Sequence, residues 1–233
     1  MKKKDRLRER QKEILKGWND ICILGADRPP LMYPPLNPDG ILFIGLNPSF
    51  TKKDDEKISP IKHIENALRE HQADAWVNLS FFNHHRELSE YLESIGEKSH
   101  WAAVDLFLDR ETNANALIKA IWENGKLTSN AEKQLKYAKE FVEIANPKLI
   151  VVANAKATDL LWERLRESES NPLPGLSSER FHQCGVHMTK IGGKKDTPVF
   201  FCSQMSGGAM DNFTRKRLFW HIGRILRPDK SLV

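Results

Sequence analysis

Cysteine is scarce in this chain of 233 residues, and its three copies lie far apart. Cys22, Cys184 and Cys202 form no C-x-x-C pair, which argues against a disulfide framework and against a cysteine-rich metal site. His182 and His187 lie near Cys184, but on a strand residues 182 and 184 share one face while residue 187 points to the other. We therefore expect reduced, structural thiols, no metal and no cofactor.

Long hydrophobic runs are also missing. No apolar stretch approaches the roughly 18–20 residues of a membrane-spanning helix. The charged start of the sequence lacks the apolar core of about 7–15 residues that a signal peptide needs. Because 40% of the residues are hydrophobic and 29% are charged, the chain can build a core and is not disordered. We expect a cytoplasmic monomer that does not contact a membrane.

Acidic residues are outnumbered only at the two ends of the chain. Lys and Arg exceed Asp and Glu by 36 to 31, a net charge of +5. Residues 1–17 carry eight basic and three acidic side chains, or +5, and residues 211–233 carry six and two, or +4, which leaves −4 for residues 18–210. Basic clusters of this kind bind nucleic-acid phosphates, although solvated terminal helices carry the same charge.

Buried strands alternate with amphipathic helices along the sequence. Continuous apolar runs at residues 41–44 and 149–153 predict strands that are covered on both faces. Further strands are predicted at residues 101–108, 181–191 and 199–202. Helices are predicted around residues 7–22, 60–68, 88–95, 117–122, 129–146, 157–165 and 212–225, with Ser129 and Glu132 as a capping box.

This alternation predicts an α/β fold, a three-layer α/β/α sandwich with a central, mainly parallel sheet of about four strands. Residues 26–233 would form one domain, and residues 1–25 would form an amphipathic helix packed on it. In such sheets, ligands bind beyond the carboxyl ends of the strands. We therefore expect the site at the turns after Ile44, Leu108 and Cys202 and after Ala153.

The turns at these strand ends resemble the motifs of one family. Residues 44–49, Ile-Gly-Leu-Asn-Pro-Ser, are similar to the first active-site motif of the uracil-DNA glycosylase superfamily, particularly its mismatch-specific branch. Residues 203–208, Ser-Gln-Met-Ser-Gly-Gly, resemble the second motif, a loop that presses into the minor groove, and residues 147–155 resemble the strand-to-helix unit between them. The resemblance spans roughly residues 36–226. It implies a DNA repair hydrolase that cleaves the N-glycosidic bond of a flipped uracil-like or damaged base.

The first motif implies the catalytic residue. Cleavage of an N-glycosidic bond needs a polar group that positions water at the sugar, and Asn47 would hold that water by its amide oxygen. Because an amide has no useful pKa, Asn47 would be a positioning group and not a general base. Asn-Pro also commonly ends a strand, because both residues favour turns. The alternative is therefore that Asn47 has only this structural role. Gly45 and Leu46 would border the base, and Ser49 would contact the DNA.

A stacking ring is expected after the first motif. Phe50, Phe81 and Phe82 are the candidates, and the sequence does not choose between residue 50 and the pair at 81 and 82. Aromatic side chains at such positions also serve as core residues.

Two residues, Asp105 and Gln204, depart from the family pattern. Asp105 occupies the strand position where several branches carry an Asn that reads the base edge. A carboxylate accepts hydrogen bonds and donates none, so it would suit an exocyclic amino group and would repel O4 of uracil unless protonated. Asp105 would otherwise be a structural carboxylate. Gln204 replaces the catalytic His of the main branches, and Met205 would be the wedge beside the flipped nucleotide.

The end of the second motif is typical of a phosphate site. Ser206, Gly207 and Gly208 would let backbone N–H groups approach a DNA phosphate before the last helix, and Arg215 and Lys216 would contact further phosphates. The same residues also suit a flexible helix cap with a solvated basic first turn.

Two other functions remain open at this stage. A catalytically silent nucleic-acid-binding module with the same fold would explain the missing His and the presence of Asp105 equally well. An enzyme acting on free nucleosides or nucleotides would need neither a wedge nor basic termini. The sequence does not identify the base, nor does it choose between single and double strands.

Overall fold

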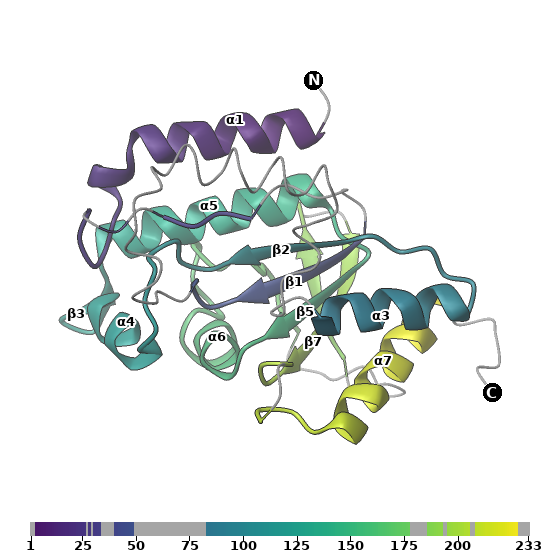
Figure 1. The fold of residues 1–233 in the computed structure, drawn as a ribbon. Coiled ribbons are helices and arrows are strands. Elements are labelled where there is room, and N and C mark those ends of the chain that lie inside the picture. The colour runs from purple at the N-terminus through teal and green to yellow at the C-terminus, as the bar shows by residue number, and fades with distance from the viewer. Residues whose placement is uncertain are drawn as a thin grey trace.

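The computed structural model describes residues 3–26, 28, 30–33, 40–48, 83–177, 186–192, 195–205 and 208–227. Within them, a five-stranded sheet lies at the centre, in the order β2-β1-β5-β7-β6 (Figure 1). Its strands are β1 (Ile41–Gly45), β2 (Trp101–Asp105), β5 (Leu149–Ala153), β6 (His187–Ile191) and β7 (Lys195–Cys202). Strands β2, β1, β5 and β7 are parallel, and β6 pairs with β7 in the antiparallel direction.

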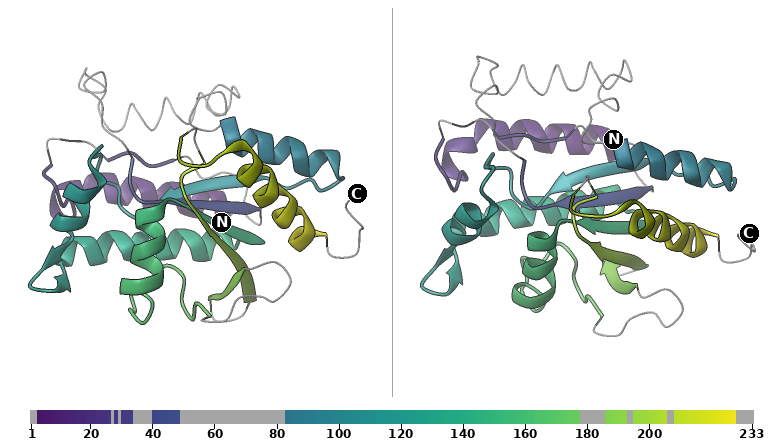
Figure 2. Two further views of the ribbon diagram at one scale, coloured as in Figure 1. Left: turned by 90° about the horizontal axis from the view of Figure 1, so that it is seen from below. Right: turned by 60° about the horizontal axis from the view of Figure 1, so that its bottom comes forward.

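Helices cover both faces of this sheet (Figure 2). One face carries α1 (Lys3–Lys16) and α5 (Ser129–Ala145), and the other carries α3 (Asn83–Ser94) and α7 (Asn212–Leu226). The predicted three-layer α/β/α sandwich with a mainly parallel sheet is confirmed. The described sheet has five strands instead of about four, because β6 adds an antiparallel edge strand.

The first helix packs by one face, as its pattern predicts. Leu7 and Ile14 are buried, and α1 lies along α5 (Figure 1). The guanidinium of Arg10 donates to the carboxylate of Glu140 on α5 at 2.6 Å. A short 3-10 turn, η1 (Trp18–Asp20), follows and buries Trp18.

Two local predictions are corrected by the structure. The strand predicted at residues 101–108 ends at Asp105, and the apolar residues after it are buried in a turn. Trp122 was predicted in a helix, but α4 (Ala114–Ala120) ends before it and a hairpin of β3 (Trp122–Glu123) and β4 (Lys126–Leu127) follows. Asn124 and Gly125 have positive φ and form the tight turn that Asn-Gly favours.

The helix start near residue 129 also differs from the prediction. Thr128, not Ser129, is the N-cap of α5, because its hydroxyl accepts the N–H of Ala131. After β5 come α6 (Ala155–Asp159), capped by Asn154, and η5 (Leu160–Arg164). The last helix starts where it was predicted: Asp211 is its N-cap and accepts two amides of the first turn of α7.

The parallel strands end together at one edge of the sheet. Every residue of β1 and β5 is buried except the last residue of each, Gly45 and Ala153, which are partly exposed. Gly45 is paired with Asp105, and Ala153 is paired with Cys202. The fold therefore brings the predicted site residues of separate segments to one place. In the described part of the chain, no helix is long and apolar enough to cross a bilayer.

Candidate functional site

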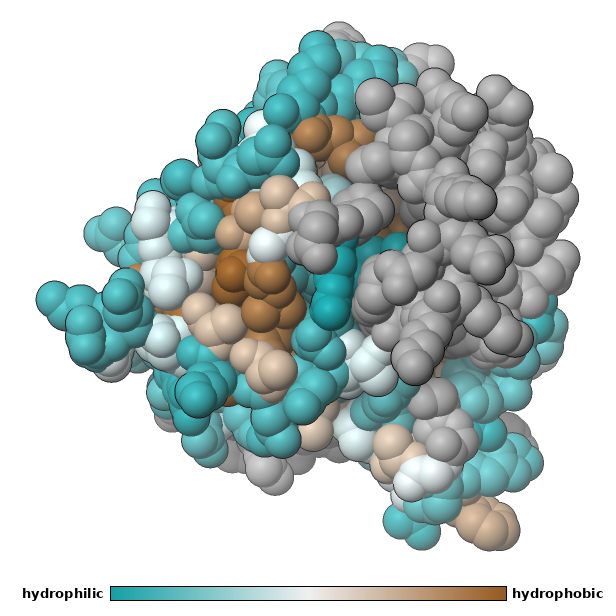
Figure 3. All heavy atoms as spheres, turned by 60° about the vertical axis from the view of Figure 1, so that its left-hand side comes forward, coloured by the Kyte–Doolittle hydropathy of each residue, from teal (hydrophilic) through white to brown (hydrophobic). Residues whose placement is uncertain are grey.

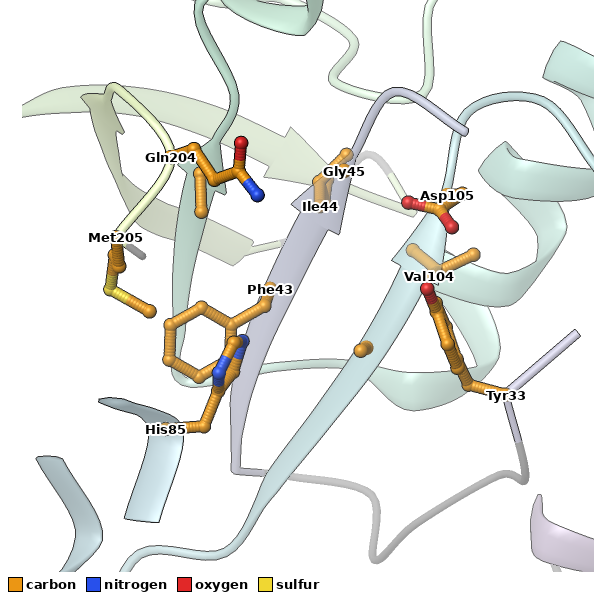
Figure 4. A pocket seen from close by; sticks show the side chains of 11 residues that line it. Tyr33, Phe43, Ile44, Gly45, His85, Val104, Asp105, Gln204 and Met205 are labelled. Carbon is orange, nitrogen blue, oxygen red and sulfur yellow. The ribbon is translucent and has the colours of Figure 1, made fainter. Parts of the chain in front are cut away.

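A pocket opens at the carboxyl edge of the sheet, where β1, β2 and β7 end (Figure 4). It includes four of the residues that the sequence singled out: Gly45, Asp105, Gln204 and Met205. Its other lining residues are Tyr33, Phe43, Ile44, His85, Ala103, Val104 and Ala153. Residues of the segments 44–49 and 203–208 therefore line one pocket together with Asp105.

Gly45 and Asp105 are neighbours across the β1–β2 pair, and they fit only because residue 45 has no side chain. A Cβ atom at residue 45 would stand 2.0 Å from Oδ1 of Asp105. Such an approach is far inside van der Waals contact, so any larger residue must displace the carboxyl group. The glycine therefore makes room for the acid.

We expect Gly45→Ala to lower the free energy of unfolding by about 1–3 kcal/mol, because the buried carboxyl group has little freedom to move away. Gly17→Ala is the matched control, since a Cβ there would stand 3.6 Å from the backbone oxygen of Glu13, an ordinary van der Waals contact. Chemical denaturation of both variants checks this expectation. Equal, small effects at the two positions would contradict the close packing of Gly45 on Asp105.

Asp105 is a buried acid with a strongly shifted pKa. Its residue is 6% exposed, and burial raises the pKa of its carboxyl group to about 7. The Tyr33 hydroxyl points at this carboxyl group (Figure 4) and, as a hydrogen-bond donor, lowers the pKa by less than burial raises it. Among the described residues, Oδ2 of Asp105 has no hydrogen-bond partner. Near neutral pH, the pocket therefore holds an acid that is partly protonated.

The other titratable side chains of the pocket are neutral. Burial lowers the pKa of His85 to about 3, and burial raises the pKa of Tyr33 well above 10. The ring of His85 packs edge-on against Phe43, with 4.1 Å between ring centres, and lies 5.0 Å from the ring of Trp101. One wall of the pocket is therefore aromatic and uncharged.

Asn47 follows β1 but does not line the pocket. Its Nδ2 donates to the backbone carbonyls of Pro48, Asp109 and Glu111 at 3.0, 3.2 and 2.8 Å. These bonds tie the turn after β1 to the turn after β2. They also fix the amide plane, so that the amide oxygen faces away from the three carbonyls.

Two residues of the second motif, Gln204 and Met205, line the pocket and differ in exposure. Gln204 is exposed and borders the pocket, with Gly45 and Ile44 between it and Asp105 (Figure 4). Met205 is only 2% exposed and packs inside the pocket wall. Met205 does not project from the surface here as a wedge between bases would, and its role as a wedge stays a prediction.

Two further residues that the sequence predicts in contact with a base or with DNA are mostly buried. Leu46 is 1% exposed in the core, so its side chain cannot border a base, and its carbonyl accepts the N–H of Phe107 at 2.9 Å. Nε of Arg215 donates to Glu87 on α3 at 3.2 Å, and its side chain is 12% exposed. Arg215 therefore joins α7 to α3, whereas Lys216 is exposed to solvent.

Most of the other predicted site residues lie outside the described part of the chain. Gly208 is described, with φ of 93° in the loop before α7, a conformation that favours glycine. The remaining ones lie outside the described residues: Ser49, Phe50, Phe81, Phe82, Ser206 and Gly207.

Sequence reasoning did not assign Tyr33 and His85 to the site. Tyr33 lies in a proline-rich segment, and His85 lies in the first turn of α3. Neither residue belongs to a recognisable motif, and each reaches the pocket only through tertiary packing. The one available signal for Tyr33 was an aromatic residue among prolines, where regular structure is excluded.

The described residues contain no group of three or more His, Cys, Asp or Glu side chains that suits a metal ion. His182 and Cys184 lie outside the described residues. His187 is buried on β6, and its ring lies 4.3 Å from the ring of Trp162. Cys22 and Cys202 are free thiols.

A separate groove lies between α4, β3 and η5. It is lined by Asn115, Ile118, Lys119, Trp122, Gly125 and Arg164, and the Arg164 guanidinium lies 5.6 Å from the centre of the Trp122 ring. Figure 3 brings the side of α4 and β3 forward and shows apolar side chains gathered in a patch that hydrophilic ones surround. The groove shares no lining residue with the pocket at the carboxyl edge.

No protein-family model matches the chain, and no curated protein matches it either. The proposal for the function therefore rests on the pocket at the carboxyl edge.

Proposed function

We propose that the chain is a DNA glycosylase-like hydrolase that binds a flipped uracil-like or damaged base in the pocket at the carboxyl edge. The observation that supports this most is the meeting of Gly45, Asp105 and Gln204, which come from three distant segments, at one pocket. Hydrolysis of an N-glycosidic bond requires polar groups at the base edge and a positioned water at the sugar. The pocket and the neighbouring Asn47 offer both kinds of group.

Asp105 offers the base a hydrogen-bonding pattern that depends on its protonation. A neutral carboxylic acid donates one hydrogen bond and accepts another, as an amide does. That pattern matches the adjacent C=O and N–H groups of uracil. An ionised carboxylate only accepts, so it matches an exocyclic amino group instead. Because burial raises the pKa of Asp105 to about 7, the neutral form is available below neutral pH.

The remaining groups have supporting roles. Gln204 hydrogen-bonds the leaving base without supplying a positive charge. Asn47, with its nitrogen held by three carbonyls, has a fixed amide oxygen that can orient water. Positioning of this kind, without a strong general base, makes a slow catalyst.

A catalytically silent DNA-binding module is the second candidate. Two observations favour it: the bonds from Asn47 to three carbonyls give that residue a sufficient structural role, and Met205 does not project as a wedge. The same fold would then bind nucleic acid without cleaving it. The two candidates differ in one measurable product, the abasic site.

The test is a panel of single- and double-stranded oligonucleotides that carry different bases and lesions, incubated with the protein in excess and scored for abasic sites. We expect release of at least one base, with uracil favoured below pH 7. Absence of release from the whole panel over hours, together with intact DNA binding, would remove the hydrolase and leave the silent module.

A further inference from the structure

The outward face of α7 carries two exposed aromatic rings. Phe213 is 76% exposed and Trp220 is 43% exposed, and they stand out among the large hydrophobic residues of the described chain. Seven residues apart on a helix, the two rings lie on one face and about 10 Å apart along the axis. Exposing such rings is unfavourable unless a partner covers them.

Positive charge accompanies these rings. Lys216 and Arg217 are exposed and lie between the rings on the same helical face. The guanidinium of Arg224 lies 5.8 Å from the centre of the Trp220 ring. Helix α7 contains no Asp or Glu. The face therefore combines flat apolar surfaces with cations.

The opposite face of α7 already accounts for its packing. Leu218, Phe219 and Ile222 are buried, and the ring of Phe219 lies 6.3 Å from that of Tyr91 on α3. Arg215 pairs with Glu87 on the same helix α3. These contacts hold α7 against α3, and in the part of the chain that the structure describes Phe213, Trp220, Lys216 and Arg217 lie on the face turned away from them. Figure 2 shows α7 lying beside α3.

A single nucleic-acid strand has the chemistry that fits this face. Unpaired bases stack on exposed aromatic rings, and the phosphates between them bind Lys and Arg. A duplex hides the faces of its bases and offers only phosphates to such a surface. Gln204 at the pocket precedes the first residue of α7, Asn212, by only eight positions, so the pocket and the start of α7, which carries Phe213, are joined by a short stretch of sequence.

We propose that the outer face of α7 binds single-stranded DNA, with unpaired bases stacked on Phe213 and Trp220 and phosphates held by Lys216 and Arg217. This inference rests on the proposed function for DNA as the partner, and it adds a preference for single strands. Binding of a single strand by α7 requires no base release. This inference can therefore fail or hold independently of the proposed hydrolase activity.

The experiment measures binding of two labelled 12-mers, oligo(dT) and a strand of abasic residues with the same phosphates. The variants are Phe213→Ala, Trp220→Ala and Lys216→Ala, with Lys126→Ala on the β3–β4 hairpin as the control for loss of one exposed charge. Each loss of a ring should weaken binding of oligo(dT) about fivefold to a hundredfold and leave the abasic strand and the salt dependence unchanged. Lys216→Ala should weaken both strands and reduce the slope of log K against log salt by about 0.7.

Ring variants that bind oligo(dT) as the wild type does would overturn the inference, as would equal weakening of both strands. Binding to phosphatidylserine vesicles with no binding to oligo(dT) would also overturn it, in favour of a membrane surface. If the wild type binds oligo(dT) through the rings but releases no base from any substrate, only the proposed hydrolase fails. If base release persists while ring variants bind normally, only this inference fails.

Discussion

Replacing Asn47 with alanine is expected to slow base release by on the order of 10²-fold or more, while DNA binding persists. The amide oxygen that would orient the attacking water is lost, whereas the pocket proposed to hold the base does not include residue 47. Single-turnover release from the preferred substrate measures the chemical step, and anisotropy with the same oligonucleotide measures binding.

The structure also shows what must be controlled in that experiment. Asn47→Ala removes the bonds to the carbonyls of Asp109 and Glu111, so the turn after β2 loses support. Arg28→Ala is a matched control, because Arg28 holds the same turn through Glu111 at 2.9 Å and the carbonyl of Arg110 at 3.2 Å. A loss of activity in Arg28→Ala as large as in Asn47→Ala would assign Asn47 a structural role only.

Replacing Asp105 with asparagine is expected to stabilise the fold relative to the wild type, increasingly so as pH rises from about 4 to about 7. An acid whose pKa is raised on folding, here from 3.8 to about 7, binds its proton more tightly in the folded state. The wild type therefore loses stability across this window, by an amount that approaches about 4 kcal/mol. An amide does not titrate and does not show this loss.

His85 acts in the opposite direction and must be subtracted. Its pKa falls from 6.5 to about 3 on folding, so it contributes stability that is present above pH 6.5 and is lost as pH falls. The wild-type profile alone would therefore understate the effect of Asp105. The difference in unfolding free energy between Asp105→Asn and the wild type cancels the His85 contribution. A difference that stays constant from pH 4 to pH 8 would show that Asp105 is not a protonated, buried acid.

The sequence predicted the parts of the fold that depend on local pattern. The apolar runs of β1 and β5 match the observed strands closely, because a strand buried on both faces needs an unbroken run. The cap at Asp211 and the helix stop at Gly96, with φ of 76°, follow from local backbone chemistry. The Asn-Gly pair at residues 124 and 125 is also a local signal for a turn. The helical spacing of the apolar residues before it nevertheless led to the incorrect prediction of a helix through Trp122.

The site was predictable only in outline. Parallel strands place their carboxyl ends together, so Gly45, Asp105 and Gln204 were expected at one edge and lie there. Exposure, however, depends on contacts between distant segments. The burial of Met205 and the pairing of Arg215 with Glu87, 128 residues away, leave no trace in the local sequence. The same holds for the arrival of His85 in the pocket.

The rate of uracil release against pH tests the central claim most directly. Wild type and Asp105→Asn are compared from about pH 5.5 to pH 8.5 with enzyme in excess over a uracil-containing single strand, and the free base is quantified by mass spectrometry. The wild-type rate should fall above about pH 7, as Asp105 ionises and loses its donor, whereas Asp105→Asn should keep its rate and exceed the wild type there. Release of no base by the wild type, or the same fall with pH in both proteins, would contradict the assignment of this pocket to a glycosylase whose base reader is Asp105.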